Sequence, residues 1–393
     1  MSDRTKPVLR DHLESYQVTR PCPGVHFYIA QISLVLTNRS TGREMLINAS
    51  GTDTKESGSI VKCQMELLER FASCMPMSLP VDSTASLEGL KCLPWPEFAP
   101  YDNVSISKME MSCMRADQYC LGYGLGSACR YAVSATAVAP SIHVARFAGD
   151  SKPDIDGSGL AAGLSGARKA IVSRALCEVV ERDTMMLSWR VNGWPTRPLG
   201  EMISPEIRKI ANALSLRIVA FDITGPTGLP TVIAMAFENG GFKLTCGTSC
   251  HPLASRAVEK AALEALSIRA TAEHAVARGI VDYNVATSLD HIAYGYINGP
   301  LILDWYWRQS SHGRNMPYRG VEVSLSTYDH EPIAVRFLGG GLYSEEYEVY
   351  RVLVPRACRK EWQHERAFFD CPRLRHFLTV HGPGLNRSPH PFG

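Results

Sequence analysis

Two stretches of the chain carry the same acidic pattern, Glu-x-x-Glu-Arg. The first is ELLER, which contains Glu66 and Glu69, and the second is EVVER, which contains Glu178, Glu181 and Arg182. On a helix, residues three and four apart share a face, so the two carboxylates of each pair project together. Apolar residues occupy most of the remaining circumference of both stretches, which indicates helices that are largely buried.

A carboxylate in a buried helix must be paired or metal-bound, because desolvating a bare charge is very costly. Each triplet supplies one arginine for two glutamates, which leaves a surplus of negative charge. Hard cations such as Mg²⁺ prefer oxygen ligands, and bound Mg²⁺ often shares its remaining positions with nucleotide phosphates. The alternative is two ordinary surface salt bridges, worth about 0–1 kcal/mol each. The triplets alone leave both interpretations open.

Two further polar features could take part in such a site. The segment GSGLAAG (157–163) could aim backbone N–H groups at an anion at a helix N-terminus, or could be a plain tight turn. It matches neither a Walker A sequence nor a strict dinucleotide fingerprint, which makes a hydride-transfer enzyme a poor choice. His251 could contact phosphate or substrate, or could cap the helix that follows it. Asp183 is expected to pair locally, and Trp189 and Trp194 are assigned to the core.

The elements that must position these residues repeat in the order strand, small-residue loop, helix. Helices are expected over 60–75, 167–189, 201–215 and 254–278. Strands are expected over 26–38, 217–224, 229–238, 242–246 and 346–355, with a second strand ending at 46–48 and more within 117–147. Loops are expected over 50–58, 157–166 and 247–253. Strand 217–224 is expected to be buried on both faces.

These elements predict an α+β fold, a single domain of repeated strand–loop–helix units with mixed sheets packed against long helices. An N-terminal extension (1–24) precedes the domain (25–393), which ends in a Pro-rich tail (380–393). The tail cannot form a helix or a central strand, and a frayed end is one interpretation of it.

Composition excludes several classes of protein. The 393 residues are 45% hydrophobic and 20% charged, as in a globular protein with a real core. A net charge of +2 gives no electrostatic footprint for nucleic acid or an anionic membrane. The amino terminus has no apolar core, so it is not a signal peptide, and the twelve cysteines contain no C-x-x-C pair. A cytoplasmic protein with reduced thiols is therefore expected.

The segment SGLAAGLSGARKAIVSRALCEVVERD resembles the central signature of the YcaO family. Other pieces follow in the family's order. They are SGTDTKESGSIVKCQMELLERF, FDIT, GTSCHPLASRAVEKAALEALSIR, EVYRVLVP and PHPFG. The resemblance covers roughly residues 25–393 and, as an ordered set, is specific.

The resemblance implies a protein that binds ATP and Mg²⁺ and activates a backbone amide of a ribosomal precursor peptide. In azoline-forming members, a Cys, Ser or Thr side chain attacks the preceding carbonyl, and the oxyanion takes the γ-phosphoryl group of ATP. Loss of phosphate then leaves a thiazoline or oxazoline. Cations and arginines would stabilise the phosphoryl charge.

The resemblance also implies roles for individual residues. The Mg²⁺ ligands would be Glu66, Glu69, Glu178 and Glu181. The ATP-binding residues would be Ser158, Gly159, Glu264, Arg182 and Arg269. Both arginines would also act in catalysis, with Pro391 and Gly393 of the tail.

The chain departs from the family pattern at four places. Many members have Asn at Ser158, Lys-Gly at Thr52–Asp53 and Gln at Ser267, and these departures concern nucleotide affinity rather than the metal site. The azoline-forming branch ends in Pro-x-Pro-x-Pro, whereas Gly393 replaces the last proline here. The tail still favours that branch over thioamide or amidine formation.

The resemblance implies partners as well as a substrate. Larger azoline-forming proteins place an E1-like domain ahead of the YcaO domain, and this chain has no room for one. A separate E1-like partner that binds the precursor's leader is therefore expected, with a flavin dehydrogenase in the same pathway. A homodimer is compatible with the sequence, and no nucleic-acid or membrane partner is expected. Thioamide or amidine chemistry and a non-catalytic scaffold stay open as alternatives.

Overall fold

The computed structural model describes most of the chain. The described residues are 16–37, 44–74, 89–98, 119–127, 129–138, 158–277, 279, 287–312, 325–328, 330–337, 345–358, 371–382 and 384–392. The chain forms two compact units. Unit 1 comprises 1–98, 111–176 and 331–354, and unit 2 comprises 99–110, 177–330 and 355–393. The predicted α+β class is confirmed, and the assignment of 25–393 to one domain stays a prediction.

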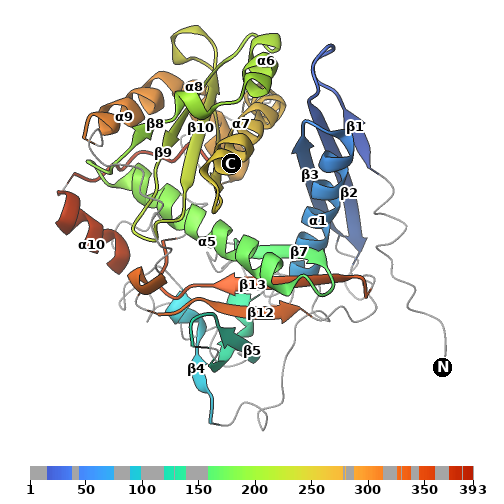
Figure 1. Ribbon diagram of the computed structural model, residues 1–393, viewed down its shortest axis with the longest axis vertical. Helices are drawn as coiled ribbons and strands as arrows, with labels where there is room; N and C mark the ends of the chain where they lie inside the picture. Colours follow the sequence, from blue (N-terminus) through green and yellow to red (C-terminus); the bar gives the residue numbers. More distant parts are fainter. Residues whose placement is uncertain are drawn as a thin grey trace. The chain divides into compact units, whose positions relative to one another are not determined.

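The first sheet of unit 1 has three antiparallel strands in sequence order, with a helix on one face (Figure 1). They are β1 (Gln17–Thr19), β2 (Tyr28–Thr37) and β3 (Glu44–Asp53), and the helix is α1 (Glu56–Cys74). Along β2, Ala30, Ile32 and Leu34 are buried, whereas Gln31, Ser33 and Val35 are exposed, as expected for a half-buried strand. Strand β1 lies within the stretch predicted as an extension, so that extension contributes to the sheet.

The second sheet of unit 1 has six strands in the order β4-β6-β5-β12-β13-β7. The strands are β4 (Lys91–Leu93), β5 (Tyr119–Gly124), β6 (Arg130–Ser134), β7 (Leu160–Leu164), β12 (Ile333–Phe337) and β13 (Tyr347–Leu353). The short helices beside them are η3 (Trp95–Phe98) and α3 (Ala135–Val138). Strand β7 occupies an edge and pairs antiparallel with β13. The long helix α5 (Arg168–Arg190) follows β7 and continues into unit 2 at Cys177.

Unit 2 contains a four-stranded sheet in the order β11-β10-β9-β8. The strands are β8 (Arg197–Pro198), β9 (Arg217–Asp222), β10 (Thr231–Phe237) and β11 (Thr245–Cys250). The helices are α6 (Pro205–Ala213), α7 (Ala254–Ala277), α8 (Ser288–Ile297), α9 (Gly299–His312) and α10 (Pro372–His381). Short 3-10 turns are η5 (Gly200–Met202), η6 (Asn239–Gly241) and η7 (Leu325–Thr327). Figure 1 shows α7 and α8 beside this sheet.

Local sequence signals explain where two of these helices begin. Ser204 accepts a hydrogen bond from the Ile207 amide and Pro205 follows it, which together start α6. Thr287 and Asp290 form a reciprocal capping box at the start of α8.

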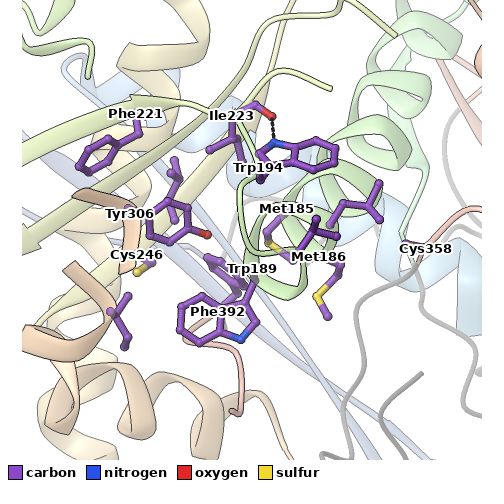
Figure 2. Close-up of a cluster of buried hydrophobic side chains, with 14 of the residues drawn as sticks. Met185, Met186, Trp189, Trp194, Phe221, Ile223, Cys246, Tyr306, Cys358 and Phe392 are labelled. Carbon is purple, nitrogen blue, oxygen red and sulfur yellow. Dashed lines mark hydrogen bonds between the residues drawn. The ribbon is translucent and has the colours of Figure 1, made fainter. Parts of the chain in front are cut away.

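The core of unit 2 is built around large aromatic side chains from distant parts of the chain (Figure 2). Trp189 packs edge-to-face against Phe392, and the Trp194 indole donates to the Ile223 carbonyl at 3.0 Å. Both tryptophans are buried, as predicted. The tail is anchored rather than frayed, because Phe392 is part of this core.

Two predicted loops are wrong in part, because both contain the end of a strand. Strand β3 runs on to Asp53, and β11 runs on to Cys250. Small residues are needed in these strands because a helix passes directly over them. An added Cβ on Gly51 or Gly247 would collide with the backbone of α1 or α7. Small and polar composition therefore reflects close helix packing here, and not a loop.

Two other element predictions also change. The predicted turn 157–166 contains strand β7, and strand 217–224 is only partly buried along β9. Strands β10 and β11 are both buried along their whole length, although β11 lies at the edge of this sheet. Strands predicted within 139–147 lie outside the described residues.

Candidate functional site

In unit 2, two glutamates from different helices converge on one residue of an edge strand. The Thr248 hydroxyl donates to Glu181 Oε1 at 2.7 Å, and the Thr248 amide donates to Glu264 Oε2 at 2.7 Å. The Cys250 amide also donates to Glu181 Oε2 at 3.1 Å. Thr248 and Cys250 lie on β11, Glu181 on α5 and Glu264 on α7. The end of β11 therefore orients both carboxylates through fixed hydrogen bonds.

The other predicted site residues of α5, Arg182 and Glu178, are close to Glu181 in sequence. Arg182 Nη1 lies 3.6 Å from Glu181 Oε1, and both side chains are mostly buried, with 18% and 12% exposed. Glu178 is half-buried one turn earlier on α5. This helix is as buried as the sequence predicts, because its apolar positions face the core on most sides.

In unit 1, the α1 glutamates also accept hydrogen bonds from edge-strand amides. The Ser50 amide on β3 donates to Glu66 Oε2 at 2.8 Å, and the Ala162 amide on β7 donates to Glu69 Oε1 at 2.8 Å. Arg70 Nε donates to Glu66 Oε1 at 2.9 Å. Glu66 is 28% exposed and Arg70 is 54% exposed, so this part of α1 borders solvent.

The carboxylates fit Mg²⁺ by donor type, although they are not gathered as a metal cage. Among the residues that the structure describes, no group of three or more His, Cys, Asp or Glu side chains could hold a metal ion. Each carboxylate oxygen has two lone-pair directions, so one oxygen can accept a hydrogen bond and also bind a cation. Hard oxygen donors of this kind match Mg²⁺, which commonly takes few protein ligands and completes its shell with water and phosphate.

The glycine-rich segment 157–163 leads into strand β7 and forms most of it. Gly159 is buried with φ of 82°, a left-handed conformation that favours glycine. Its carbonyl accepts from the Val352 amide at 2.8 Å, which joins it to β13. Ser158 precedes it and is half-buried. The predicted contact of Ser158 and Gly159 with a nucleotide stays a prediction.

Arg269 lies among carboxylates toward the other end of the β10–β11 hairpin. Its Nη2 donates to Glu238 at 2.6 Å, and its Nε donates to Glu273 at 2.9 Å. Its Nη1 donates to the Lys243 carbonyl, and the guanidinium lies 5.0 Å from the Tyr296 ring centroid. A phosphate at Arg269 would therefore compete with these partners. The predicted phosphate contact stays a prediction.

Asp183 forms a buried polar centre with residues far away in the chain, so the expected local pairing is wrong. Arg373 of α10 donates to both of its oxygens, with Nε and Nη2 each 2.7 Å from an oxygen. The Cys358 amide and the Tyr328 hydroxyl donate to the same carboxylate at 2.8 and 3.2 Å. Burial opposes the charge of Arg373, but the Asp183 carboxylate outweighs it and raises the pKa of Arg373. No sequence signal placed Arg373 here, since the two residues are far apart in the chain.

The tail is held by α5 and α8. Trp189 Nε1 donates to the Ser388 carbonyl at 3.1 Å, and Arg190 Nη1 donates to the same carbonyl at 2.7 Å. The His390 ring stacks on His291 of α8, with centroids 3.6 Å apart. Pro391 is buried next to them, and Gly393 lies outside the described residues. The catalytic role predicted for the tail stays a prediction.

His251 caps helix α7. Its Nδ1 accepts from the Leu253 amide at 3.0 Å, which bears out the capping alternative. Burial, together with the positive charges of Lys260 and Arg256, lowers the pKa of His251. A neutral ring keeps that nitrogen available as an acceptor. The cysteines of the described ranges are free thiols, as expected.

We compared the chain with protein families and with known proteins. Residues 123–316 match a family model described as YcaO cyclodehydratase, ATP- and Mg²⁺-binding. A sequence search of curated proteins finds no match. Along the described helices, none combines the length and the apolar character needed to cross a membrane.

Solved structures share the fold at low sequence identity. A heterocyclase in complex with substrate and cofactor matches with a TM-score of 0.62 and 16% identity, over 96% of this chain and 54% of that chain. The chain thus spans about half the length of that protein. A chain of the Escherichia coli microcin synthetase McbBCD complex matches with a TM-score of 0.63 and 16% sequence identity, over 87% of this chain and 87% of that chain. YcaO from Methanopyrus kandleri, bound with AMPPCP and Mg²⁺, matches with a TM-score of 0.53 and 19% sequence identity, over 87% of this chain and 85% of that chain.

Proposed function

Residues 123–316 of this chain are a YcaO domain, and from this premise we propose that the chain is an ATP- and Mg²⁺-dependent peptide cyclodehydratase. A Cys, Ser or Thr side chain of a precursor peptide attacks the preceding carbonyl carbon. The resulting oxyanion takes the γ-phosphoryl group of ATP, which leaves ADP. Departure of phosphate then gives the azoline ring. Phosphorylation is needed because the amide oxygen is otherwise a poor leaving group.

The convergence of Glu181 and Glu264 on Thr248 carries this proposal. Hydrogen bonds of 2.7 Å from one residue fix two carboxylates, so neither has to be reoriented when a cation binds. Glu66, Glu69, Glu178 and Glu181 are proposed to hold Mg²⁺, which supplies positive charge to the phosphoryl oxygens. Arg182 is proposed to orient the phosphates, because its guanidinium lies beside Glu181 with 18% of the side chain exposed. Ser158, Gly159, Glu264 and Arg269 are proposed to complete the nucleotide contacts.

At the departure Thr52–Asp53, a lysine of α1 pairs with the Asp53 carboxylate. Lys62 Nζ lies 2.7 Å from Asp53 Oδ2 and donates to the Thr52 carbonyl at 2.8 Å. Lys62 is also one turn before Glu66 on α1. A lysine from the helix thus occupies the region where many family members have a lysine in the loop.

We propose a separate E1-like partner that recruits the precursor peptide. One matched structure is a multi-subunit synthetase complex, and this chain covers 87% of the matched chain in it. The isolated chain is then expected to hydrolyse ATP slowly and to modify little peptide. Full-rate cyclisation by the purified chain alone would contradict this proposal. A flavin dehydrogenase in the pathway, a homodimer and a cytoplasmic location also stay predictions.

Two experiments test the enzyme proposal. Calorimetry of the chain with ATP should show binding that requires Mg²⁺ and that Glu181→Gln weakens strongly. Glu259→Gln is a matched control, because Glu259 lies on α7 but pairs with the exposed Arg256. If the wild-type chain binds no ATP with Mg²⁺ present, the scaffold alternative gains and the enzyme proposal fails.

The ring chemistry is tested by the mass of the product. With precursor and partner, each ring should remove one water from the peptide. Exchange of oxygen for sulfur would indicate thioamide formation instead. Amidine closure also removes water, so fragmentation must place the new bond at a Cys, Ser or Thr side chain.

A further inference from the structure

A pair of buried thiols lies in unit 2, and neither belongs to the residues proposed to hold ATP or Mg²⁺. Cys358 Sγ and Cys371 Sγ are 3.3 Å apart, within the aromatic core of unit 2. Cys358 follows strand β13, and Cys371 is the residue that caps α10. A disulfide bond is about 2.05 Å long, so the sulfurs need to close by little more than 1 Å. Neither thiol has a role in the proposed reaction.

The surroundings make the two sulfurs chemically unequal. Cys371 Sγ accepts from the Leu374 amide at 3.3 Å, at the positive end of the α10 dipole. The hydrogen bond from the Cys358 thiol lowers the pKa of Cys371 and raises that of Cys358. Cys371 is therefore the better thiolate, and Cys358 holds the proton that a resolving thiol must lose.

Neighbouring contacts hold both residues in place. The Cys358 amide donates to Asp183 at 2.8 Å. Arg373, two residues after Cys371, binds the same carboxylate. The two cysteine backbones are thus tied to one buried ion pair, which limits how far the sulfurs can separate.

We propose that Cys358 and Cys371 are a redox modification site that a small peroxide converts to a disulfide. The Cys371 thiolate attacks one peroxide oxygen, the O–O bond breaks, and protonation of the departing oxygen gives water. Cys371 becomes a sulfenic acid. The Cys358 sulfur, on losing its proton, attacks the sulfenic sulfur, and the hydroxyl leaves as a second water. The two thiols lose two protons and two electrons, and hydrogen peroxide is reduced to two waters.

Burial selects the class of oxidant. Cys358 is 7% exposed and Cys371 is 3% exposed. Attack on glutathione disulfide needs a bulky partner to reach the sulfur, so the oxidant proposed for these buried thiols is a small uncharged peroxide. The disulfide would join the residues that follow β13 covalently to the start of α10.

The test exposes the folded full-length chain to hydrogen peroxide, blocks the remaining thiols with an alkylating agent and maps disulfides by mass spectrometry of peptides. A peptide joining Cys358 to Cys371 is expected, with melting several degrees higher before a reductant is added. Cys371→Ser should abolish both changes while keeping the helix cap, because serine is a good capping residue. Cys358→Ser should do the same.

Cys246→Ser is the matched control, since Cys246 is buried in the same core and should leave the disulfide unchanged. Sulfinic acid at Cys371 without a cross-link would overturn the proposal. A cross-link between Cys177 and Cys250 in place of the expected pair would do so too. A cross-link formed by glutathione disulfide but not by peroxide would overturn the assigned oxidant.

Discussion

The Glu-x-x-Glu-Arg triplets of α1 and α5 are alike in sequence and different in environment. On α1, Glu66 pairs with Arg70 at a border with solvent. On α5, Glu181 is almost fully covered and takes hydrogen bonds from two residues of β11. The sequence predicted both helices to be largely buried; Glu181 on α5 is buried, whereas Glu178, Glu66 and Glu69 are half-buried. The difference comes from what packs on each helix, which the triplet itself does not encode.

One feature is nevertheless common to both regions. Glu66, Glu69 and Glu264 each accept the amide of a strand at the edge of a sheet, respectively from β3, β7 and β11. Edge strands have backbone groups without a strand partner on one side, and helix carboxylates satisfy these groups. A glutamate at such a place serves the fold whether or not a cation binds. Substitutions can separate these two roles.

The largest expected effect is on turnover. Glu66→Gln and Glu178→Gln should each lower turnover by at least about 1,000-fold, because each removes a charge proposed to hold Mg²⁺. Circular dichroism should show an intact fold. Full activity of the Glu66→Gln, Glu178→Gln double variant would reduce the triplets to structural elements.

The variant Glu181→Gln should lower the free energy of unfolding more than Glu66→Gln does. Gln presents an NH₂ group toward either the Thr248 hydroxyl or the Cys250 amide, and the amide is a donor that needs an acceptor. We expect a loss of about 1–3 kcal/mol in the free energy of unfolding, measured with urea. Glu66→Gln should lose less, because water reaches its oxygens. Equal losses would show that burial does not distinguish the two regions.

A second large effect is expected at Asp183. Asp183→Asn leaves Arg373 without its carboxylate in the core, which should cost about 3–5 kcal/mol of the free energy of unfolding. Arg373→Met should cost a similar amount by leaving Asp183 uncompensated. The double variant should recover part of the loss. A single variant as stable as the wild type would mean that the pair is not maintained in solution.

The sequence anticipated the long helices well, because their apolar periodicity is strong. Two of the predicted site residues on α5, Glu181 and Arg182, do lie side by side in the structure, and their roles stay predictions. The sequence missed Thr248, because GTSCHPL has the composition of a loop, although β11 extends through Cys250. The Asp183–Arg373 pair joins residues 190 positions apart in the chain. Such long-range pairs depend on the packing of whole elements, which local patterns do not record.

Another comparison concerns the close packing of a helix on a strand glycine, which occurs in each of the two units. Gly51→Ala and Gly247→Ala each place a Cβ against the backbone of α1 or α7, and we expect each to cost about 1–3 kcal/mol in urea unfolding. Gly200→Ala is the control, since its added Cβ meets nothing within 4 Å and should be near neutral. A neutral Gly247→Ala would show that α7 lies farther from β11 than described.

A further prediction concerns how stability depends on pH in the acid range. Glu331 in unit 1 accepts from Ser127 and Tyr131, and from the amides of 126 and 127. Burial raises its pKa, but these hydrogen bonds outweigh burial and lower the pKa from 4.5 to about 2. The ionised form is therefore preferred in the folded state, and its stabilisation is present above about pH 4.5 and lost as pH falls toward 2. Glu331→Gln should remove this part of the acid sensitivity; an unchanged urea midpoint profile between those pH values would contradict it.

The smallest expected effect is at Arg70, and it closes the comparison of the triplets. Its pair with Glu66 is an exposed i,i+4 contact, so Arg70→Ala should cost about 0–1 kcal/mol and the loss should shrink in high salt. A double-mutant cycle with Glu66→Gln gives the coupling energy directly. The Ser50 amide holds Glu66 independently of Arg70, so Mg²⁺-dependent ATP binding should survive Arg70→Ala. Loss of ATP binding in this variant would mean that Arg70 positions Glu66, and that the two triplets depend on their arginines in the same way.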